Sequence, residues 1–117
     1  MSLSDLVRAC LSYDALTARQ WVADSIRQGI SWSSVPQPID LDEVEMAVAA
    51  GIAEVLAERA GQRPPTWAST IEGVSTPVYL VKAARTMPRL RRLCEEEGPE
   101  PLRRRRILAP PEFLTVA

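Results

Sequence analysis

The sequence predicts an all-α fold, a compact bundle of about five helices with an extended C-terminal tail. Three observations lead to this prediction. The apolar side chains are mostly Ala, Leu, Val and Ile; several stretches place them at helical spacing; and Gly or Pro ends several of those stretches. The 117 residues, 46% hydrophobic and 25% charged, suit one helical domain over 1–117, in which 99–117 is a basic and apolar C-terminal segment.

Two helices are expected in the first 28 residues. Residues 3–11 suit a short helix with Ser2 or Ser4 as its cap, and Ser12 is expected to cap a second helix that runs to Gln28. Gly29 suits the end of the second helix. Its core-facing residues are predicted to be Ala15, Ala18, Val22 and Ile26, with Trp21 at the edge.

The strongest helical pattern lies in the middle of the chain. Residues 29–39 contain serines and prolines and are predicted to form a loop, with Trp32 packed on the core. A helix is expected over 41–60, with Asp40 as its cap and Glu43 completing a capping box. Its small residues on a second face predict a central helix with neighbours on two sides. The narrow solvent-exposed side of this helix is predicted to carry Glu43, Glu54 and Glu58.

Proline and glycine divide the last third of the chain into short elements. Thr76-Pro77 predicts the start of a helix over 78–85. Thr86 is expected to cap a further helix from Met87 to about Glu97, and Gly98 to stop it. Residues 102–106 suit one more helical turn, and 107–117 look extended.

The charge is divided between the two ends of the chain. Residues 1–60 carry four arginines and nine acids, a net charge of −5, whereas residues 82–106 carry nine basic residues and four acids, a net charge of +5. The whole chain has a net charge of only −1. Such asymmetry suggests an acidic partner, or a docking of the two charged regions on one another.

The arginine run 103–106 has three possible explanations. Phosphates of a nucleic acid would neutralise it and make binding sensitive to salt. An acidic patch on a partner protein would suit the guanidinium forks equally well. The run would otherwise be solvated, or neutralised by the acidic half of this chain. The low total charge and the lack of aromatic residues between the basic ones disfavour nucleic acid.

The expected helix at 87–97 has arginines in its first half and glutamates at its end. The helix dipole favours the opposite order by about 0.3–1 kcal/mol for each well-placed charge. This order of charges indicates either a functional surface or ion pairs with other parts of the fold.

No pattern of catalytic residues is apparent in the sequence. It has no histidine, no glycine-rich phosphate loop and no G-x-S-x-G motif. Cys10 and Cys94 are far apart and are expected to be buried thiols rather than metal ligands. We therefore expect no enzyme activity, no cofactor and no metal. With no signal-peptide pattern and no apolar stretch long enough to span a membrane, the sequence predicts a cytoplasmic protein.

Four stretches resemble small actinobacterial proteins encoded beside putative toxins. They are Ala18-Arg19-Gln20-Trp21, the segment AVAAGIAEVLAERAGQRPPTW at 47–67, Pro77 to Leu80, and the ending PEPLRRRRILAPPEFL at 99–114. The resemblance implies an antitoxin-like or regulatory binding function, with a toxin as the protein partner. It covers most of the chain and includes no catalytic motif.

The sequence thus predicts a non-enzymatic protein-binding module, antitoxin-like, that neutralises a partner through its C-terminal third. Electrostatic contacts are expected from Arg89, Arg92, Arg103, Arg104, Arg105 and Arg106, and apolar anchors from Ile107, Leu108, Phe113 and Leu114. The alternative is a nucleic-acid-binding regulator that acts through the same arginines. A third possibility is a structural domain whose tail packs on its own core.

Overall fold

The computed structural model describes residues 2–116 of the chain. Within them the fold is helical, with five α-helices, three short 3-10 helices and one pair of two-residue strands. In chain order the elements are α1 (Leu3–Leu11), α2 (Ala15–Gln28), η1 (Trp32–Ser34), α3 (Glu43–Arg59), η2 (Thr66–Thr70), β1 (Val78–Tyr79), η3 (Lys82–Arg85), α4 (Pro88–Glu97), α5 (Glu100–Arg103) and β2 (Ile107–Leu108). The prediction of an all-α bundle of about five helices is confirmed.

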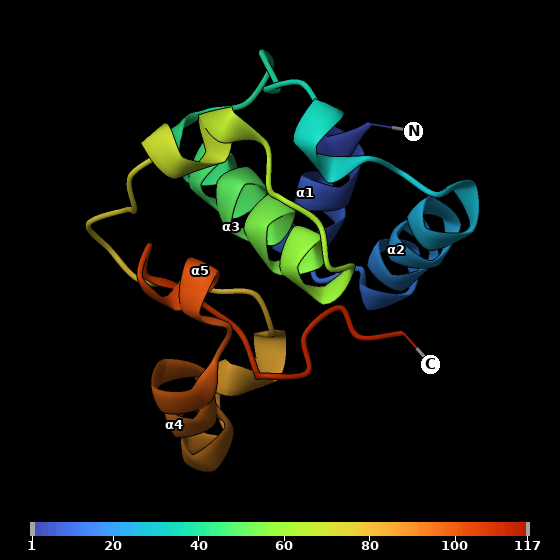
Figure 1. The fold of residues 1–117 in the computed structure, drawn as a ribbon. Coiled ribbons are helices and arrows are strands. Elements are labelled where there is room, and N and C mark those ends of the chain that lie inside the picture. The colour runs from blue at the N-terminus through green and yellow to red at the C-terminus, as the bar shows by residue number, and fades with distance from the viewer. Residues whose placement is uncertain (1, 117) are drawn as a thin grey trace.

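Helix α3 runs through the middle of the molecule, with α1 and α2 toward one side and α5 toward the other (Figure 1). Every residue from Ala47 to Ala53 is buried, so α3 is covered on more than one face, as its small residues predicted. Helix α5 packs closely on α3 at Gly51, where a Cβ atom would clash with Leu102 Cδ2 and lie 3.3 Å from Leu102 Cα. A side chain at this position would force Leu102 to move.

The buried face of helix α2 overlaps the predicted one at Ala18 and Val22 but is shifted toward Trp21. Its buried residues are Ala18, Trp21, Val22 and Ser25. Ile26 is 62% exposed, and Ala15 is also exposed, so their predicted core positions are wrong. The large Trp21 ring determines the face, because its Nε1 donates to the Ser2 carbonyl at 2.9 Å and its centroid lies 6.2 Å from that of the buried Trp32.

Two helix caps lie two residues beyond the predicted ones. Asp14, not Ser12, caps α2 and accepts from the Thr17 amide at 3.1 Å. Asp42, not Asp40, caps α3 and forms the capping box with Glu45. At the end of α1, Ser12 is the C-cap and its hydroxyl donates to the Ala9 carbonyl.

The predicted helix over 78–85 is wrong. Residues Val78 and Tyr79 instead pair in parallel with Ile107 and Leu108 as strands β1 and β2, and only η3 is helical. The Leu80 amide donates to the Leu108 carbonyl at 2.9 Å. The C-terminal segment therefore supplies a backbone partner that local sequence does not reveal.

Helix α4 lies at the edge of the fold, away from α1 and α2 (Figure 1), and packs mainly on η3 and α5. It covers the predicted region and ends at Gly98. Its N-cap is Met87 without a side-chain hydrogen bond, so the predicted Thr86 cap is wrong. The following helical turn is α5 at 100–103, slightly earlier than predicted.

Candidate partner interface

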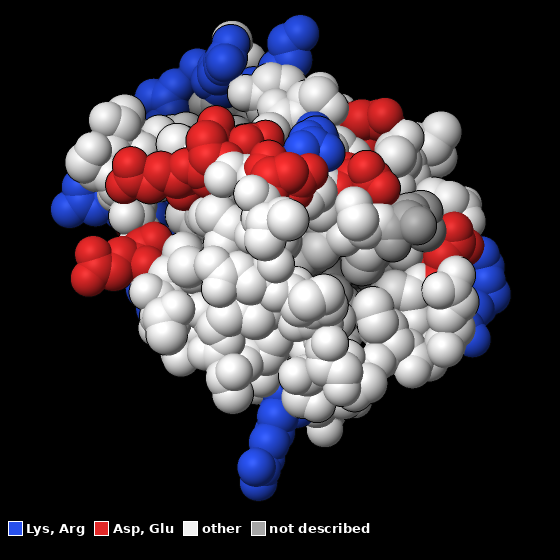
Figure 2. Space-filling model, turned by 90° about the horizontal axis from the view of Figure 1, so that it is seen from above, with Lys and Arg blue, Asp and Glu red and all other residues white. Residues whose placement is uncertain are grey.

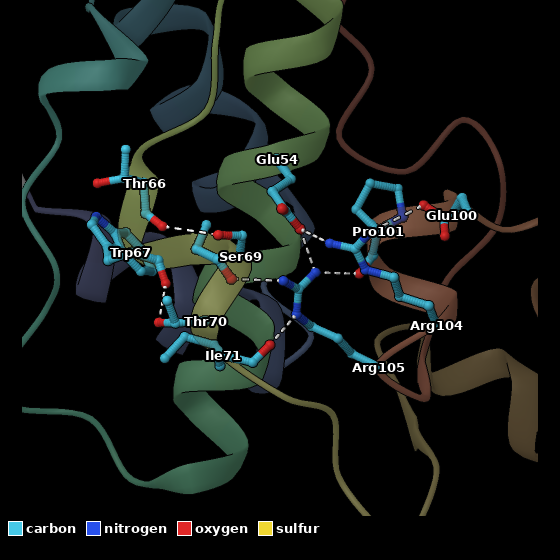
Figure 3. A network of polar contacts seen from close by, with 11 residues as sticks. Glu54, Thr66, Trp67, Ser69, Thr70, Ile71, Glu100, Pro101, Arg104 and Arg105 are labelled. Carbon is cyan, nitrogen blue, oxygen red and sulfur yellow. Dashed lines mark hydrogen bonds and ion pairs between the residues drawn. The ribbon is translucent and has the colours of Figure 1, made fainter.

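The third residue of the arginine run, Arg105, is buried within the protein. It is 2% exposed, and its guanidinium donates to the carbonyls of Ala68, Ile71 and Pro101 at 2.8, 3.0 and 2.7 Å. It also forms an ion pair with Glu54 of α3 (Figure 3). These contacts join α3, η2 and α5, and they leave Arg105 inaccessible to a partner.

Arg104 shares the same acidic partner. Its guanidinium lies 2.7 Å from Glu54 Oε1 and 3.7 Å from Glu100 Oε2 (Figure 3). The Glu54 side chain is only 11% exposed, whereas that of Arg104 is 46% exposed. Glu54 was predicted to lie on the solvent-exposed side of the central helix. The structure instead places its carboxylate between Arg104 and Arg105, where it neutralises part of the arginine run.

The outer arginines of the run bind backbone carbonyls. Arg103 donates to the carbonyl of Glu96, at the end of α4. Arg106 donates to the carbonyl of Ser75 at 2.8 Å. The run is therefore attached to the rest of the fold at each of its four residues, and of the four only Arg104 and Arg106 are exposed.

The apolar residues proposed as anchors belong largely to the core of this chain. Ile107, Leu108 and Leu114 are buried, with exposed fractions of 0%, 7% and 7%, and Phe113 packs against the same core while partly exposed. In this conformation the three buried residues cannot reach a partner. The tail packs on its own chain, as the structural alternative proposed.

Four further exposed basic side chains of the C-terminal third lie on α4 and η3. Lys82, Arg85, Arg89 and Arg92 are all exposed. None of these four forms an ion pair within residues 2–116. We call these four residues the α4 basic surface. Lys82 and Arg85 were not among the predicted binding residues; their place in the basic stretch 82–106 was the signal that could have included them.

Side-chain hydrogen bonds attach α4 to its neighbours. Arg91 donates to the carbonyls of Ala84 and Arg85 at 3.1 and 2.6 Å. The Tyr79 hydroxyl of β1 donates to Glu95, and this hydrogen bond raises the pKa of the tyrosine. Arg91 and Glu95 thus hold α4 in place, whereas Arg89 and Arg92 have no such contact among the described residues.

On one face of the molecule, acidic side chains gather in a band, with a broad uncharged area beside it (Figure 2). One acid of the N-terminal half, Asp40, accepts from the Ser4 hydroxyl at 2.7 Å and from Arg8 at 2.8 Å. The hydrogen bond from Arg8, followed by that from Ser4, lowers the pKa of Asp40. The α4 basic surface forms no ion pair with these acids in the described part of the chain, so the fold does not neutralise it.

The cysteines are buried and free. Burial raises the pKa of the Cys10 thiol to about 12, and burial followed by the charges of Glu112 and Glu95 raises that of Cys94. Neither thiol is activated as a nucleophile. No group of three or more His, Cys, Asp or Glu among residues 2–116 is arranged to hold a metal ion.

Comparison with family models, curated proteins and solved structures finds no match to this chain. Among the described helices, none is long and apolar enough to cross a membrane.

Proposed function

We propose that this chain is a non-enzymatic protein-binding module, an antitoxin-like regulator that neutralises a partner protein through the α4 basic surface. One observation carries the proposal: Lys82, Arg85, Arg89 and Arg92 are exposed at the edge of the fold and have no ion pair within residues 2–116. Clustered like charges repel one another, and an acidic surface on a partner relieves that repulsion.

The spacing of these residues favours a single contact region. Arg89 and Arg92 are three residues apart on α4 and therefore share one side of the helix. Lys82 and Arg85 have the same spacing on η3, where residues three apart are eclipsed. Met87 lies between the two pairs and is 52% exposed. An exposed thioether between these residues in the sequence suits a protein interface, because methionine adapts to irregular apolar contacts.

The acids of α4 favour a protein over a nucleic acid as the partner. Glu96 and Glu97 are exposed on the same helix as the arginines. Carboxylates at this position would repel phosphates, but they can pair with basic residues of a protein. The order of charges along α4, which the helix dipole disfavours, is consistent with a surface kept for binding.

The antitoxin-like form of the proposal rests on the resemblance of the sequence to small proteins encoded beside putative toxins. The proposal includes a cytoplasmic location for the complex. The role of the arginine run changes in this proposal: Arg105 stabilises the fold, and α4 carries the binding contacts. Arg104 and Arg106 remain exposed and can contribute at the rim.

The test is affinity capture of the tagged protein from its native lysate, with and without nuclease, at low and high salt. The variant carries Arg89→Glu and Arg92→Glu, which reverse the charge of one side of α4. The matched control carries Arg27→Glu and Arg63→Glu, which make the same change of charge at exposed positions outside α4 and η3. Deletion of the tail is unsuitable, because it removes core residues such as Ile107.

We expect one stoichiometric protein in the captures by the native chain and by the control, and its loss from the α4 variant. Capture should survive nuclease and weaken at high salt. Equal capture by the α4 variant and the control would refute the proposed interface. Recovery of nucleic acid, lost at high salt, would instead support the alternative regulator.

A further inference from the structure

A groove of about 720 Å³ separates the α1–α2 junction from the segment Leu80–Ala83 and the C-terminal tail. Its walls include the buried side chains of Cys10, Ala18, Leu80 and Leu114. Arg19 and Lys82 line it from exposed positions. Small-molecule sites typically have volumes of about 300–1,000 Å³, a mostly apolar lining and a few polar groups.

Two residues of this groove, Tyr13 and Leu114, have a left-handed backbone conformation that their side chains disfavour. Helices α1, α2 and α3 all end with the same pair of backbone hydrogen bonds, as in Asp14 N to Ala9 O and Tyr13 N to Cys10 O for α1. The left-handed residue of this motif is Gly29 in α2 and Gly61 in α3, with φ values of 64° and 67°. In α1 it is Tyr13, with φ of 62°.

A glycine would therefore complete the end of α1 at least as well as the tyrosine does. The side chain of Tyr13 lines the groove. The Arg85 guanidinium lies 5.8 Å from its ring centroid and donates to its hydroxyl at 3.3 Å. A residue retained in a disfavoured conformation at the wall of a cavity indicates a role in binding.

The charges at the groove indicate the kind of ligand. Arg19 and Lys82 form no ion pair within residues 2–116, and Arg85 adds a third cation beside Tyr13. The groove also includes two acids. Asp14 is engaged as the cap of α2, where the Thr17 hydrogen bonds lower its pKa, and Glu112 is exposed on the tail. Arg19 and Lys82, which form no ion pair within residues 2–116, therefore line a groove whose other residues are mostly apolar.

We propose that this groove binds an amphipathic carboxylate, a linear aliphatic chain with a terminal acid. The chain would lie on Ala15, Val81 and Phe113, which line the groove and are at least partly exposed, and the carboxylate would pair with Arg19 and Lys82. Tyr13 contributes an apolar ring face and a hydroxyl to the same wall. This site requires neither Arg89 nor Arg92, although it shares Lys82 with the α4 basic surface.

The experiment is calorimetric titration of the full chain with decanoate, with decanol and decyltrimethylammonium as matched probes of the same chain length. We expect saturable binding of decanoate at one site, and at least tenfold weaker binding of the other two. A charged hydrogen bond lost from the site corresponds to roughly tenfold in affinity. No saturation by decanoate up to millimolar concentration, or equal binding of decanol, would overturn the proposal.

Variants locate the site. Lys82→Gln and Arg19→Gln are each expected to weaken decanoate binding about tenfold, whereas Arg63→Gln, the same change outside the groove, should leave it unchanged. Tyr13→Gly should weaken binding while the protein remains folded by circular dichroism, because glycine suits the position. Equal losses in Lys82→Gln and Arg63→Gln would show non-specific attraction and overturn the site. Retained decanoate binding by the Arg89→Glu, Arg92→Glu variant separates this site from the protein interface.

Discussion

Substitution of Arg105 by methionine should destabilise the protein strongly. The variant loses the guanidinium that serves the carbonyls of Ala68, Ile71 and Pro101 and the carboxylate of Glu54. Removal of one partner from a buried ion pair costs about 3–5 kcal/mol, and Glu54 keeps its contact with Arg104, which favours the lower end, about 3 kcal/mol. With a urea dependence of about 2 kcal/mol per molar, the unfolding midpoint should fall by roughly 1.5 M.

The assay is urea unfolding followed by circular dichroism and by tryptophan fluorescence, because Trp21 and Trp32 are buried in the core. The control is Arg104→Met, whose half-exposed ion pair should contribute at most about 1 kcal/mol. If Arg105→Met does not fold, Glu54→Gln tests the same network by removing the charge while an acceptor remains. Equal, small effects of Arg105→Met and Arg104→Met would refute the structural role of Arg105.

Three further predictions concern the core and the surface. Gly51→Ala should destabilise the protein by about 1–3 kcal/mol, because the added Cβ would press on Leu102 and this outweighs the better helix propensity of alanine. A rise in Tm would contradict the close packing of α3 on α5. Cys10, whose pKa burial raises to about 12, should resist iodoacetamide at pH 8 in the native protein and react fully in urea, as mass spectrometry would show; rapid native labelling would contradict its burial. The pKa of the Asp40 carboxyl, measured by NMR titration, should lie below its ordinary value of 3.8 and should rise toward that value in Arg8→Gln. Because the pKa is lowered in the folded protein, the ionised carboxylate stabilises the fold above about pH 3.8, and this stabilisation is lost as the pH falls through the folded pKa. An unchanged pKa of Asp40 in Arg8→Gln would argue against the ion pair between Arg8 and Asp40.

Local chemistry in the sequence was sufficient to predict the helices that have strong caps and stops. The bounds of α1, the end of α2 at Gly29 and the end of α4 at Gly98 follow from short-range signals. Local signals did not distinguish between neighbouring caps. Asp40 and Asp42 each have a glutamate three residues later, but Asp40 binds Ser4 and Arg8 of α1, and Asp42 is the residue that caps α3.

The strand pair shows a second limit of local reasoning. Residues 78–79 have no intrinsic feature that distinguishes a strand from the start of a helix. Their backbone partner, Ile107–Leu108, is nearly thirty residues away, and only the folded chain brings the two segments together. The prediction of a helix at 78–85 was therefore wrong because the pairing depends on a distant segment, which the local sequence does not reveal.

The sequence by itself determined the helical class, the buried central helix and the separation of charge between the two ends of the chain. It could not assign roles within Arg103–Arg106, because four identical side chains carry identical local information. The tertiary structure decided that Arg105 points into the network with Glu54 while Arg104 remains half exposed. It also decided that the unpaired charge of the C-terminal third lies on α4 and η3, since the arginine run meets its acids and carbonyls within the fold.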